Sequence, residues 1–180
     1  MEGTVIKSTG SWYEIKTEKN SVINARLKGK FRTKNIKSTN PIAVGDNVAF
    51  EVEGNEGVIF EIKERKNYLI RKSINLSKQV QIIASNIDQL FLLITLKDPL
   101  TTLGFIDRVL VGAEAYRIPI ILVYNKIDLI NSSNLREQLI EWKGIYEKAG
   151  NEQLEVSATK SIGIELLKNK MRGSISIFFF

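Results

Sequence analysis

The 180-residue sequence contains no cysteine and no histidine. Without thiols it can form no disulfide, and without thiolates or imidazoles it lacks the ligands of ordinary structural zinc sites. It also has no apolar run close to the roughly 20 residues that a membrane-spanning helix needs, and its first residues show no basic-then-apolar signal pattern. These absences predict a cytoplasmic protein with no membrane partner, and we expect it to be a monomer.

A further absence concerns nucleotide chemistry. The sequence has no Gly-x-x-x-x-Gly-Lys-Ser/Thr loop (the P-loop), which cradles nucleotide phosphates. It also has no Asp-x-x-Gly segment that could follow a γ-phosphate. We therefore assign no catalytic residue for phosphate chemistry and no metal ligand.

The net charge of +6 belongs entirely to the first part of the chain. Residues 1–78 hold 15 Lys/Arg against 9 Asp/Glu, whereas residues 79–180 hold 11 of each kind. This asymmetry predicts two domains, the first of which faces a polyanion such as a nucleic acid. The alternative is a solvated basic surface without a charged partner.

The first part of the chain is rich in short strand-forming segments and has no helical pattern. The predicted strands are residues 4–7, 11–17, 22–27, 47–53 and 58–62. This spacing favours a small barrel such as the OB-fold, which often binds oligonucleotides. The long loop before the fourth strand carries candidate RNA-binding residues that suit phosphate contact and base stacking: Lys28, Lys30, Phe31, Arg32 and Lys34. A mobile solvated loop, with its phenylalanine tucked into the barrel, is the other interpretation.

Residues 65–81 are polar and basic, and we interpret them as the connection between domains 1–75 and 76–180. Beyond them, apolar strands alternate with amphipathic helices. The strands are predicted at residues 89–96, 120–124, 154–156 and 174–180. Nearly continuous apolar strands are typical of a parallel sheet covered on both faces, so the pattern predicts a doubly wound α/β domain. We expect Asn134 to cap the second helix and Gly150 to end it.

The most informative stretch is Asn125-Lys126-Ile127-Asp128, which directly follows a predicted buried strand. Guanine presents two donors side by side, N1–H and the N2 amine, and the carboxylate of Asp128 can accept both, whereas adenine lacks that pair. A hydrogen bond to a charged group contributes roughly 1.5–3 kcal/mol, so this pair can dominate base selection. Asn125 can contact the base edge and its own loop, and Lys126 can lay its aliphatic stem along the base plane.

The segment Val156-Ser157-Ala158-Thr159 follows the next predicted strand. We expect the turn at Ser157 and Ala158 to bring backbone N–H groups to guanine O6, because the small side chain of Ala158 permits close approach. The alternative is that Asn125 and Asp128 only cap the helix or turn that follows them.

Other segments share their order and spacing with a known family: residues 27–32, 45–48, 65–71, 84–89, 96–99, 106–108, 125–128 and 156–158. Together they resemble the circularly permuted GTPases that act in small ribosomal subunit maturation, of the RsgA/YjeQ type. The resemblance implies an OB-fold barrel that binds rRNA, followed by a P-loop GTPase-type domain in which the guanine-recognition segments precede the P-loop. It also implies GTP with Mg²⁺, a C-terminal zinc domain, and the small ribosomal subunit as partner.

On this interpretation the chain is the N-terminal part of such a protein, and its last residues begin the strand that leads into the P-loop. The phosphate, Mg²⁺ and Zn²⁺ sites of the family, and the machinery that hydrolyses GTP to GDP and phosphate, would lie beyond it. Two rival interpretations stay open. One is a non-enzymatic RNA-binding module with an α/β scaffold, and the other is a different α/β nucleotide-binding enzyme fused to a barrel.

Overall fold

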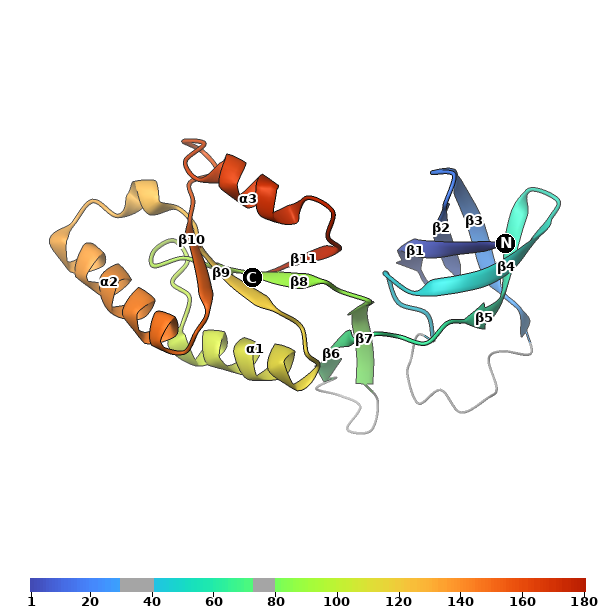
Figure 1. Ribbon diagram of the computed structural model, residues 1–180, viewed down its shortest axis with the longest axis horizontal. Coiled ribbons are helices and arrows are strands. Elements are labelled where there is room, and N and C mark those ends of the chain that lie inside the picture. The colour runs from blue at the N-terminus through green and yellow to red at the C-terminus, as the bar shows by residue number, and fades with distance from the viewer. Residues whose placement is uncertain (30–40, 73–79) are drawn as a thin grey trace. The chain divides into compact units, whose positions relative to one another are not determined.

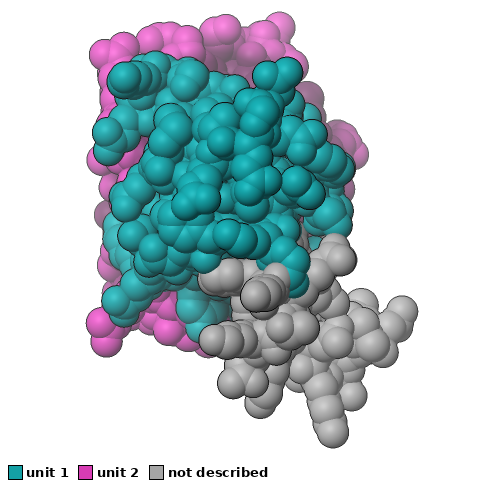
Figure 2. Space-filling view, turned by 90° about the vertical axis from the view of Figure 1, so that its right-hand side faces the viewer, with its two compact units in different colours: residues 1–87 teal, residues 88–180 magenta. Residues whose placement is uncertain are grey.

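Figure 1 shows the protein as a computed structural model, which describes residues 1–29, 41–72 and 80–180. The chain divides into two compact units, residues 1–87 and 88–180, which have separate colours in Figure 2. Each unit has a hydrophobic core of its own.

The first unit contains a closed barrel of five strands in the order β1-β2-β3-β5-β4. The strands are β1 (Glu2–Thr9), β2 (Trp12–Thr17), β3 (Val22–Leu27), β4 (Asn47–Glu53) and β5 (Glu56–Ile62). The pair β3 and β5 runs parallel, and the other neighbours run antiparallel. The predicted small barrel is therefore confirmed, as is the position of each of its strands along the chain.

Alternation of side chains along the strands builds the barrel core. On β2, Tyr13 and Ile15 are buried, whereas Trp12 is 49% exposed. Because successive residues of a strand point to opposite faces, this pattern leaves one face of β2 in the core and the other in solvent. Each fully buried side chain of this size contributes roughly 1.5–3 kcal/mol. The buried cluster consists of Val5, Tyr13, Ile15, Ala25, Ile42, Val48, Phe50 and Ile59.

The first unit also contains an antiparallel hairpin of β6 (Tyr68–Lys72) and β7 (Val80–Ser85). Residues 65–81, which we interpreted as the connection between domains, contain β6 and the start of β7. The strands were not predicted because the mainly polar sequence of residues 71–79 separates their short apolar stretches. The compact units meet at residue 87, so the boundary predicted after residue 75 falls between the two hairpin strands.

A buried carboxylate fastens this hairpin to the barrel. Asp46 is completely buried. Arg65 donates from Nε to Asp46 Oδ1 at 2.7 Å and from Nη2 to Oδ2 at 2.6 Å. The hydroxyl of Ser85, at the end of β7, donates to Asp46 Oδ1 at 2.5 Å. The hydrogen bond to Asp46 is the main reason why the pKa of Arg65 is raised, and this bidentate pairing is the strong form of an ion pair.

The residue before this carboxylate has to be glycine. Gly45 has φ 93, and a Cβ added to it would lie 2.0 Å from the Ser85 carbonyl oxygen. Only a residue without a side chain adopts that backbone conformation readily and lets β7 approach so closely. The Gly45-Asp46 pair therefore joins hairpin and barrel through both backbone and side chain.

The second unit is a parallel sheet in the order β10-β9-β8-β11 (Figure 1). Its strands are β8 (Gln89–Ile94), β9 (Ile120–Tyr124), β10 (Glu152–Glu155) and β11 (Ser176–Phe179), and its helices are α1 (Leu103–Ala115), α2 (Ser133–Lys148) and α3 (Ile164–Met171). Of the helices in the described part of the chain, none combines the length and the apolar character that a membrane crossing needs.

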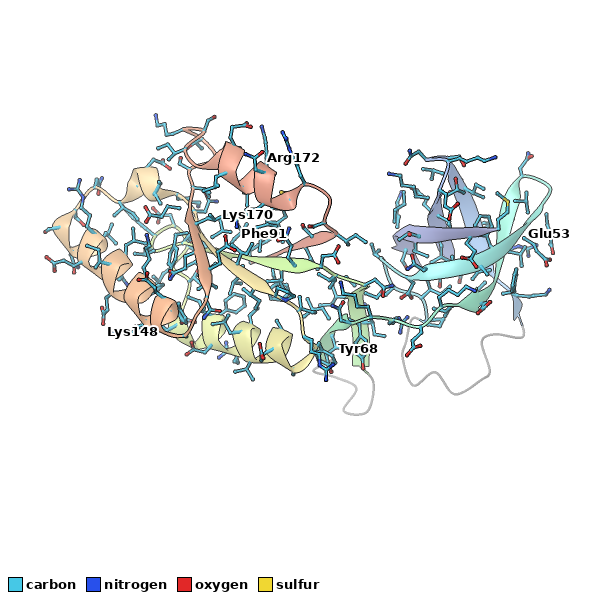
Figure 3. All side chains as sticks on the ribbon, viewed as in Figure 1. Glu53, Tyr68, Phe91, Lys148, Lys170 and Arg172 are labelled. Atoms are coloured by element: carbon cyan, nitrogen blue, oxygen red, sulfur yellow. The ribbon has the colours of Figure 1, made fainter. Side chains whose placement is uncertain are left out.

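Helices cover both faces of this sheet. On one face α3 packs over Phe91, which Figure 3 labels, and Phe178 of β11 stacks on the same ring with centroids 5.2 Å apart. On the other face Phe179 stacks on Phe105 of α1 at 6.1 Å. The neighbouring residues of β11 thus face opposite helix layers, which confirms the doubly wound pattern.

The start of α2 corrects one prediction. Its N-cap is Ser132, whose Oγ accepts a hydrogen bond from Leu135 N–H at 3.3 Å. Asn134, the predicted cap, already lies within the helix. Residues 132–134 are all good capping types, so propensity does not separate them. Gly150 follows the helix with φ 81, as predicted for its end.

Candidate nucleotide-binding site

The predicted base-recognition residues follow two neighbouring parallel strands. Residues 125–128 come directly after β9, and residues 157–158 follow β10 after one intervening residue. Backbone hydrogen bonds join the two loops: Val156 N–H donates to the Tyr124 carbonyl at 2.8 Å, and Ile127 N–H donates to the Val156 carbonyl at 3.3 Å. Both loops therefore lie at the carboxyl edge of the sheet, where open α/β sheets bind ligands.

The Asn125-Lys126 step is held against β8. The N–H of Asn125 donates to the carbonyl of Ile94 at 2.8 Å, and its side-chain Oδ1 accepts from Lys126 N–H at 2.8 Å. Lys126 adopts the left-handed conformation, with φ 60, and leads into a 3₁₀ turn at Ile127–Leu129. The Asn125 side chain thus contacts its own loop.

Asp128 and Ser157 form the central contact between the two loops. The buried Ser157 hydroxyl donates to Asp128 Oδ1, while its oxygen accepts from Lys160 N–H at 3.1 Å. Thr159 makes a longer contact, from its hydroxyl to Asp128 Oδ2 at 3.5 Å. These contacts, led by the Ser157 hydrogen bond, lower the pKa of Asp128. The carboxylate is therefore ionised at neutral pH and acts as an acceptor.

The turn after β10 is closed by a pair of backbone hydrogen bonds. Ser157 N–H donates to the Ile162 carbonyl at 2.9 Å, and Ile162 N–H donates back to the Ser157 carbonyl at 3.0 Å. Ala158, within this turn, is exposed. Its N–H has no hydrogen-bond partner among the described residues. The turn thus presents the Ala158 N–H as an unused donor in the described structure.

A third loop, which follows β8, contacts this pair. The ammonium group of Lys126 donates to the backbone carbonyl of Asp98. Two threonines close the loop, because Thr95 N–H donates to Thr101 Oγ1 at 3.0 Å and Thr101 N–H donates to the Thr95 carbonyl at 2.8 Å. Thr95, Asp98 and Thr101 were not among the predicted site residues. The available signal was the position of the loop, directly after a buried parallel strand.

Of the candidate RNA-binding residues, the structure describes only Lys28. Lys28 is exposed just beyond β3, and its N–H donates to the Ile59 carbonyl at 3.0 Å. Lys30, Phe31, Arg32 and Lys34 lie outside the described residues. The structure therefore fixes the position of Lys28 on the barrel and leaves the other four as sequence predictions.

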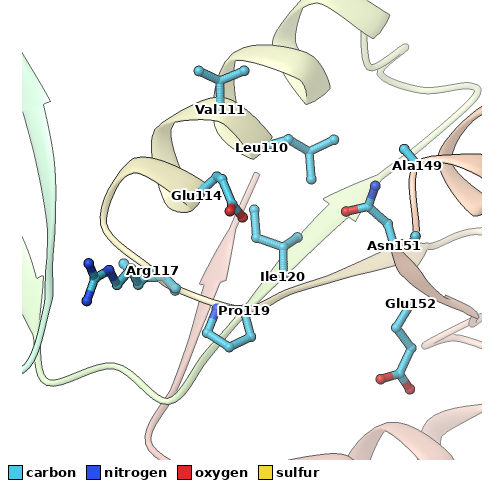
Figure 4. Close-up of a pocket in the computed structure, with 11 residues that line it drawn as sticks. Leu110, Val111, Glu114, Arg117, Pro119, Ile120, Ala149, Asn151 and Glu152 are labelled. Carbon is cyan, nitrogen blue, oxygen red and sulfur yellow. The ribbon is translucent and has the colours of Figure 1, made fainter.

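A separate groove lies at the opposite, amino edge of the sheet (Figure 4). Ile120 and Glu152, the first residues of β9 and β10, line it together with Val111 of α1. Because it lies at the strand starts, it shares no lining residue with the loops that carry Lys126 and Asp128. We assign no nucleotide to it.

Comparison with known families gives two matches along the chain. The model described as RsgA N-terminal domain matches residues 2–59, and the one described as RsgA GTPase matches residues 62–179. The chain belongs to the RsgA GTPase family. This membership confirms the resemblance seen in the sequence and sets aside the rival of an unrelated α/β enzyme fused to a barrel.

Relatives in this family are considerably longer. The chain is 54% identical to the small ribosomal subunit biogenesis GTPase RsgA of Flavobacterium johnsoniae, covering 99% of this chain and 56% of the relative. It is 47% identical to RsgA 2 of Bacteroides thetaiotaomicron, covering 99% of this chain and 57% of the relative. The chain thus spans little more than half the length of the curated relatives it matches.

Solved structures of the family share the fold. YjeQ from Thermotoga maritima superimposes with a TM-score of 0.80 at 31% identity, over 99% of this chain and 59% of that one. YloQ, described as a circularly permuted GTPase, gives 0.73 at 29% identity, over 98% of this chain and 58% of that one. The barrel followed by a GTPase-type α/β domain is therefore the fold of this chain.

Proposed function

We propose that this chain supplies the rRNA-binding and guanine-recognition parts of a GTPase that acts in late maturation of the small ribosomal subunit. In complete form the protein would bind GTP and rRNA in the cytoplasm and hydrolyse GTP to GDP and phosphate. One observation carries the proposal: Asp128 and Ser157 are paired at the carboxyl edge of a sheet that matches the RsgA GTPase family. The names of the relatives support the ribosomal role.

The chemistry of Asp128 suits guanine. Its lowered pKa keeps it anionic, so it can accept hydrogen bonds from N1–H and the N2 amine together. The Ser157 hydroxyl uses one lone-pair site of a carboxylate that has about four. Ser157 thus orients the carboxylate and leaves acceptor sites for the base, because Thr159 approaches Oδ2 only at 3.5 Å.

The other site residues complete a slot for the purine. Lys126 is half-buried and extends from the loop after β9 to the loop after β8, so its stem can lie against the base plane. The unused N–H of Ala158 is a donor suited to guanine O6. Asn125 fixes the loop from which both Lys126 and Asp128 project.

The basic barrel suits the phosphates of rRNA. The excess of positive charge lies in residues 1–78, and Lys28 is exposed beside the predicted basic segment. Lysine and arginine contacts with phosphates depend on charge and release counterions, so they need no fixed base geometry. We propose Lys28, Lys30, Phe31, Arg32 and Lys34 as the RNA contacts.

The described residues do not form a metal site. Over residues 1–29, 41–72 and 80–180, no group of three or more Asp, Glu, His or Cys side chains is placed to hold a metal ion. The Mg²⁺ that accompanies GTP would neutralise charge on the phosphates. We derive no step through it from this chain.

Competition between nucleotides tests the proposal. Fluorescently labelled GDP bound to the 180-residue chain should be displaced by unlabelled GDP at a concentration at least about tenfold lower than ADP, because only guanine supplies the donor pair for Asp128. Equal displacement by the two would favour the rival, a non-enzymatic RNA-binding module whose α/β unit is a scaffold.

A further inference from the structure

The loop between β8 and α1, residues 95–101, is closed by hydrogen bonds at its two ends. Thr95 is buried at 9% exposure and is bonded to Thr101 through both of its backbone groups. The Thr95 hydroxyl also donates to the carbonyl of Pro99. The path of the loop is therefore fixed from inside, and Asp98 lies in the middle of it.

Asp98 presents its backbone to Lys126, and its side chain is left in solvent. It has φ 51, and its carbonyl accepts a hydrogen bond from the Lys126 ammonium group. Its carboxylate is 69% exposed and 4.0 Å from Lys97. The position of the Lys126 ammonium thus depends on the backbone geometry of the loop, which the two threonines set.

A lysine side chain that is already held in place loses less conformational entropy when a ligand binds than a mobile one does. A lysine stem has many rotamers, and immobilising such a side chain on a ligand lowers the affinity. Here both ends of Lys126 are held: its backbone N–H by Asn125 Oδ1 and its ammonium by Asp98. The four-carbon stem is thereby already extended across the carboxyl edge of the sheet when a base arrives.

We propose that the loop of residues 95–101 is a positioning element for guanine recognition. Thr95 and Thr101 fix the Asp98 carbonyl, and this carbonyl holds Lys126 as a preformed wall of the base slot. The inference rests on the function proposed above, and it assigns roles to three residues outside the Asn-Lys-x-Asp segment. Thr95, Asp98 and Thr101 are positioning residues, since they act on the base only through Lys126.

NMR titration of the 180-residue chain with guanosine tests this proposal. Adenosine serves as the comparison, and nucleosides are chosen because they lack phosphates and therefore report on the base slot. Lys126→Met keeps most of the apolar stem and removes the ammonium, whereas Thr101→Val removes the hydroxyl that closes the loop. Each variant should weaken guanosine binding by about three- to tenfold, and the double variant should be no weaker than Lys126→Met alone, since both act through one contact.

Two control variants separate positioning from general damage. Thr101→Ser retains a hydroxyl and should restore guanosine binding close to that of the parent chain. Thr9→Val makes the same substitution at an exposed residue, the last of β1 in the first unit, and should leave guanosine binding unchanged. The dispersion of the amide spectrum shows whether each variant is folded.

The outcomes distinguish this inference from the proposed function. A guanosine preference that survives both Lys126→Met and Thr101→Val at full affinity overturns the positioning role and leaves the function intact. Additive losses in the double variant also overturn it. Equal binding of guanosine and adenosine by the parent chain overturns both. If Thr101→Val does not fold, Lys126→Met decides alone, and unchanged affinity contradicts the proposal.

Discussion

The two units of this chain use polar side-chain contacts for different purposes. In the barrel unit, the fully buried Asp46 holds the hairpin in place, while the candidate RNA contact Lys28 is a solvent-exposed side chain. In the α/β unit, the candidate base-reading residue Asp128 is itself held by hydrogen bonds from a neighbouring loop. On the proposed assignments, different residues serve structure and recognition in the first unit, whereas in the second unit the contacts that join the loops also involve the candidate base-reading residue.

The difference follows from what each unit is proposed to recognise. A phosphate backbone is attracted by positive charge over a range of geometries, whereas a base edge is distinguished only by donors and acceptors at fixed positions. The barrel unit should therefore lose stability when its buried contacts are removed, and the α/β unit should lose selectivity. The predictions below start from this contrast and run from the largest expected effect to the smallest.

The largest effect is expected in the barrel unit from Arg65→Ala. It leaves the fully buried Asp46 carboxylate without its bidentate partner. Removing one member of a buried ion pair typically costs about 3–5 kcal/mol. Hydrogen exchange read by mass spectrometry should show lost protection in residues 1–87 and unchanged protection in residues 88–180.

Arg26→Ala is the matched control. Arg26 is more than half exposed and lies 3.6 Å from both Glu53 and Glu56, and exposed pairs contribute about 0–1 kcal/mol. Glu53, which Figure 3 labels, is one of these two partners of Arg26. If Arg26→Ala and Arg65→Ala reduced protection equally, the Arg65–Asp46 ion pair would not be a main source of stability in the first unit.

In the α/β unit, Asp128→Asn should change selectivity with little loss of stability. An amide cannot accept from both guanine donors, but it can donate to the C2 oxygen of xanthine. Loss of a charged acceptor costs about 1.5–3 kcal/mol of guanine binding, while xanthosine binding should rise. Glu137→Gln, on the exposed side of α2, is the control. Unchanged preference for guanosine in Asp128→Asn would contradict the assignment.

A smaller effect of opposite signs is expected at two tyrosines of the α/β unit. The Tyr124 hydroxyl is buried without a hydrogen-bond partner in the described part of the chain, whereas Tyr146 donates to Asp107 Oδ1 at 2.8 Å. Tyr124→Phe should therefore stabilise by about 1 kcal/mol and Tyr146→Phe should destabilise by a similar or larger amount, as measured by urea unfolding. If both substitutions changed the free energy of unfolding in the same direction, the two hydroxyls would not differ in hydrogen bonding as described.

The Tyr124 substitution also has a pH signature. Burial raises the pKa of Tyr124 from 10.0 to about 12. Because the unfolded chain then releases the proton first, the stability that is present below pH 10 is lost as the pH rises toward 12. In Tyr124→Phe this alkaline loss should shrink without vanishing, since the pKa of Tyr146 is also raised.

The smallest effect is expected from Lys28→Ala, which removes one exposed charge from the barrel. Binding to a fragment of small-subunit rRNA should keep its sequence preference and become less salt-dependent, with the slope of log K against log salt reduced in magnitude by about 0.7–0.9. Lys148→Ala, at the end of α2 (Figure 3), should leave the slope unchanged. An equal change for both lysines would remove the barrel as the RNA-binding surface.

Much of the fold could be predicted because short sequence patterns indicate most of its strands and helices. Period-two alternation identifies the barrel strands, as Tyr13 and Ile15 on β2 illustrate, and continuous apolar runs identify the parallel strands. The N-cap of α2 was placed wrongly because Ser132 and Asn134 have similar capping propensity. The hairpin was missed because its apolar stretches are short and are separated by the mainly polar residues 71–79.

The candidate site, like the fold, could be predicted from the sequence only in part. The pairing of Asp128 with Ser157 was foreseeable in outline, since both loops follow neighbouring parallel strands. The Thr95–Thr101 closure and the Asp98 contact with Lys126 were not, because they depend on loop backbone geometry that no residue pattern encodes. The pairing of Asp46 with Arg65, 19 residues apart, is likewise a tertiary contact that composition cannot indicate.

The central claim is that the Asp128 carboxylate reads the two adjacent donors of guanine, and inosine tests it from the side of the ligand. Inosine differs from guanosine only by the absence of the N2 amine, so one of the two hydrogen bonds is deleted without altering the protein. NMR titration of the 180-residue chain should show about tenfold weaker binding of inosine than of guanosine, and this difference should disappear in Asp128→Ala. Equal affinity of the parent chain for the two nucleosides would contradict the account.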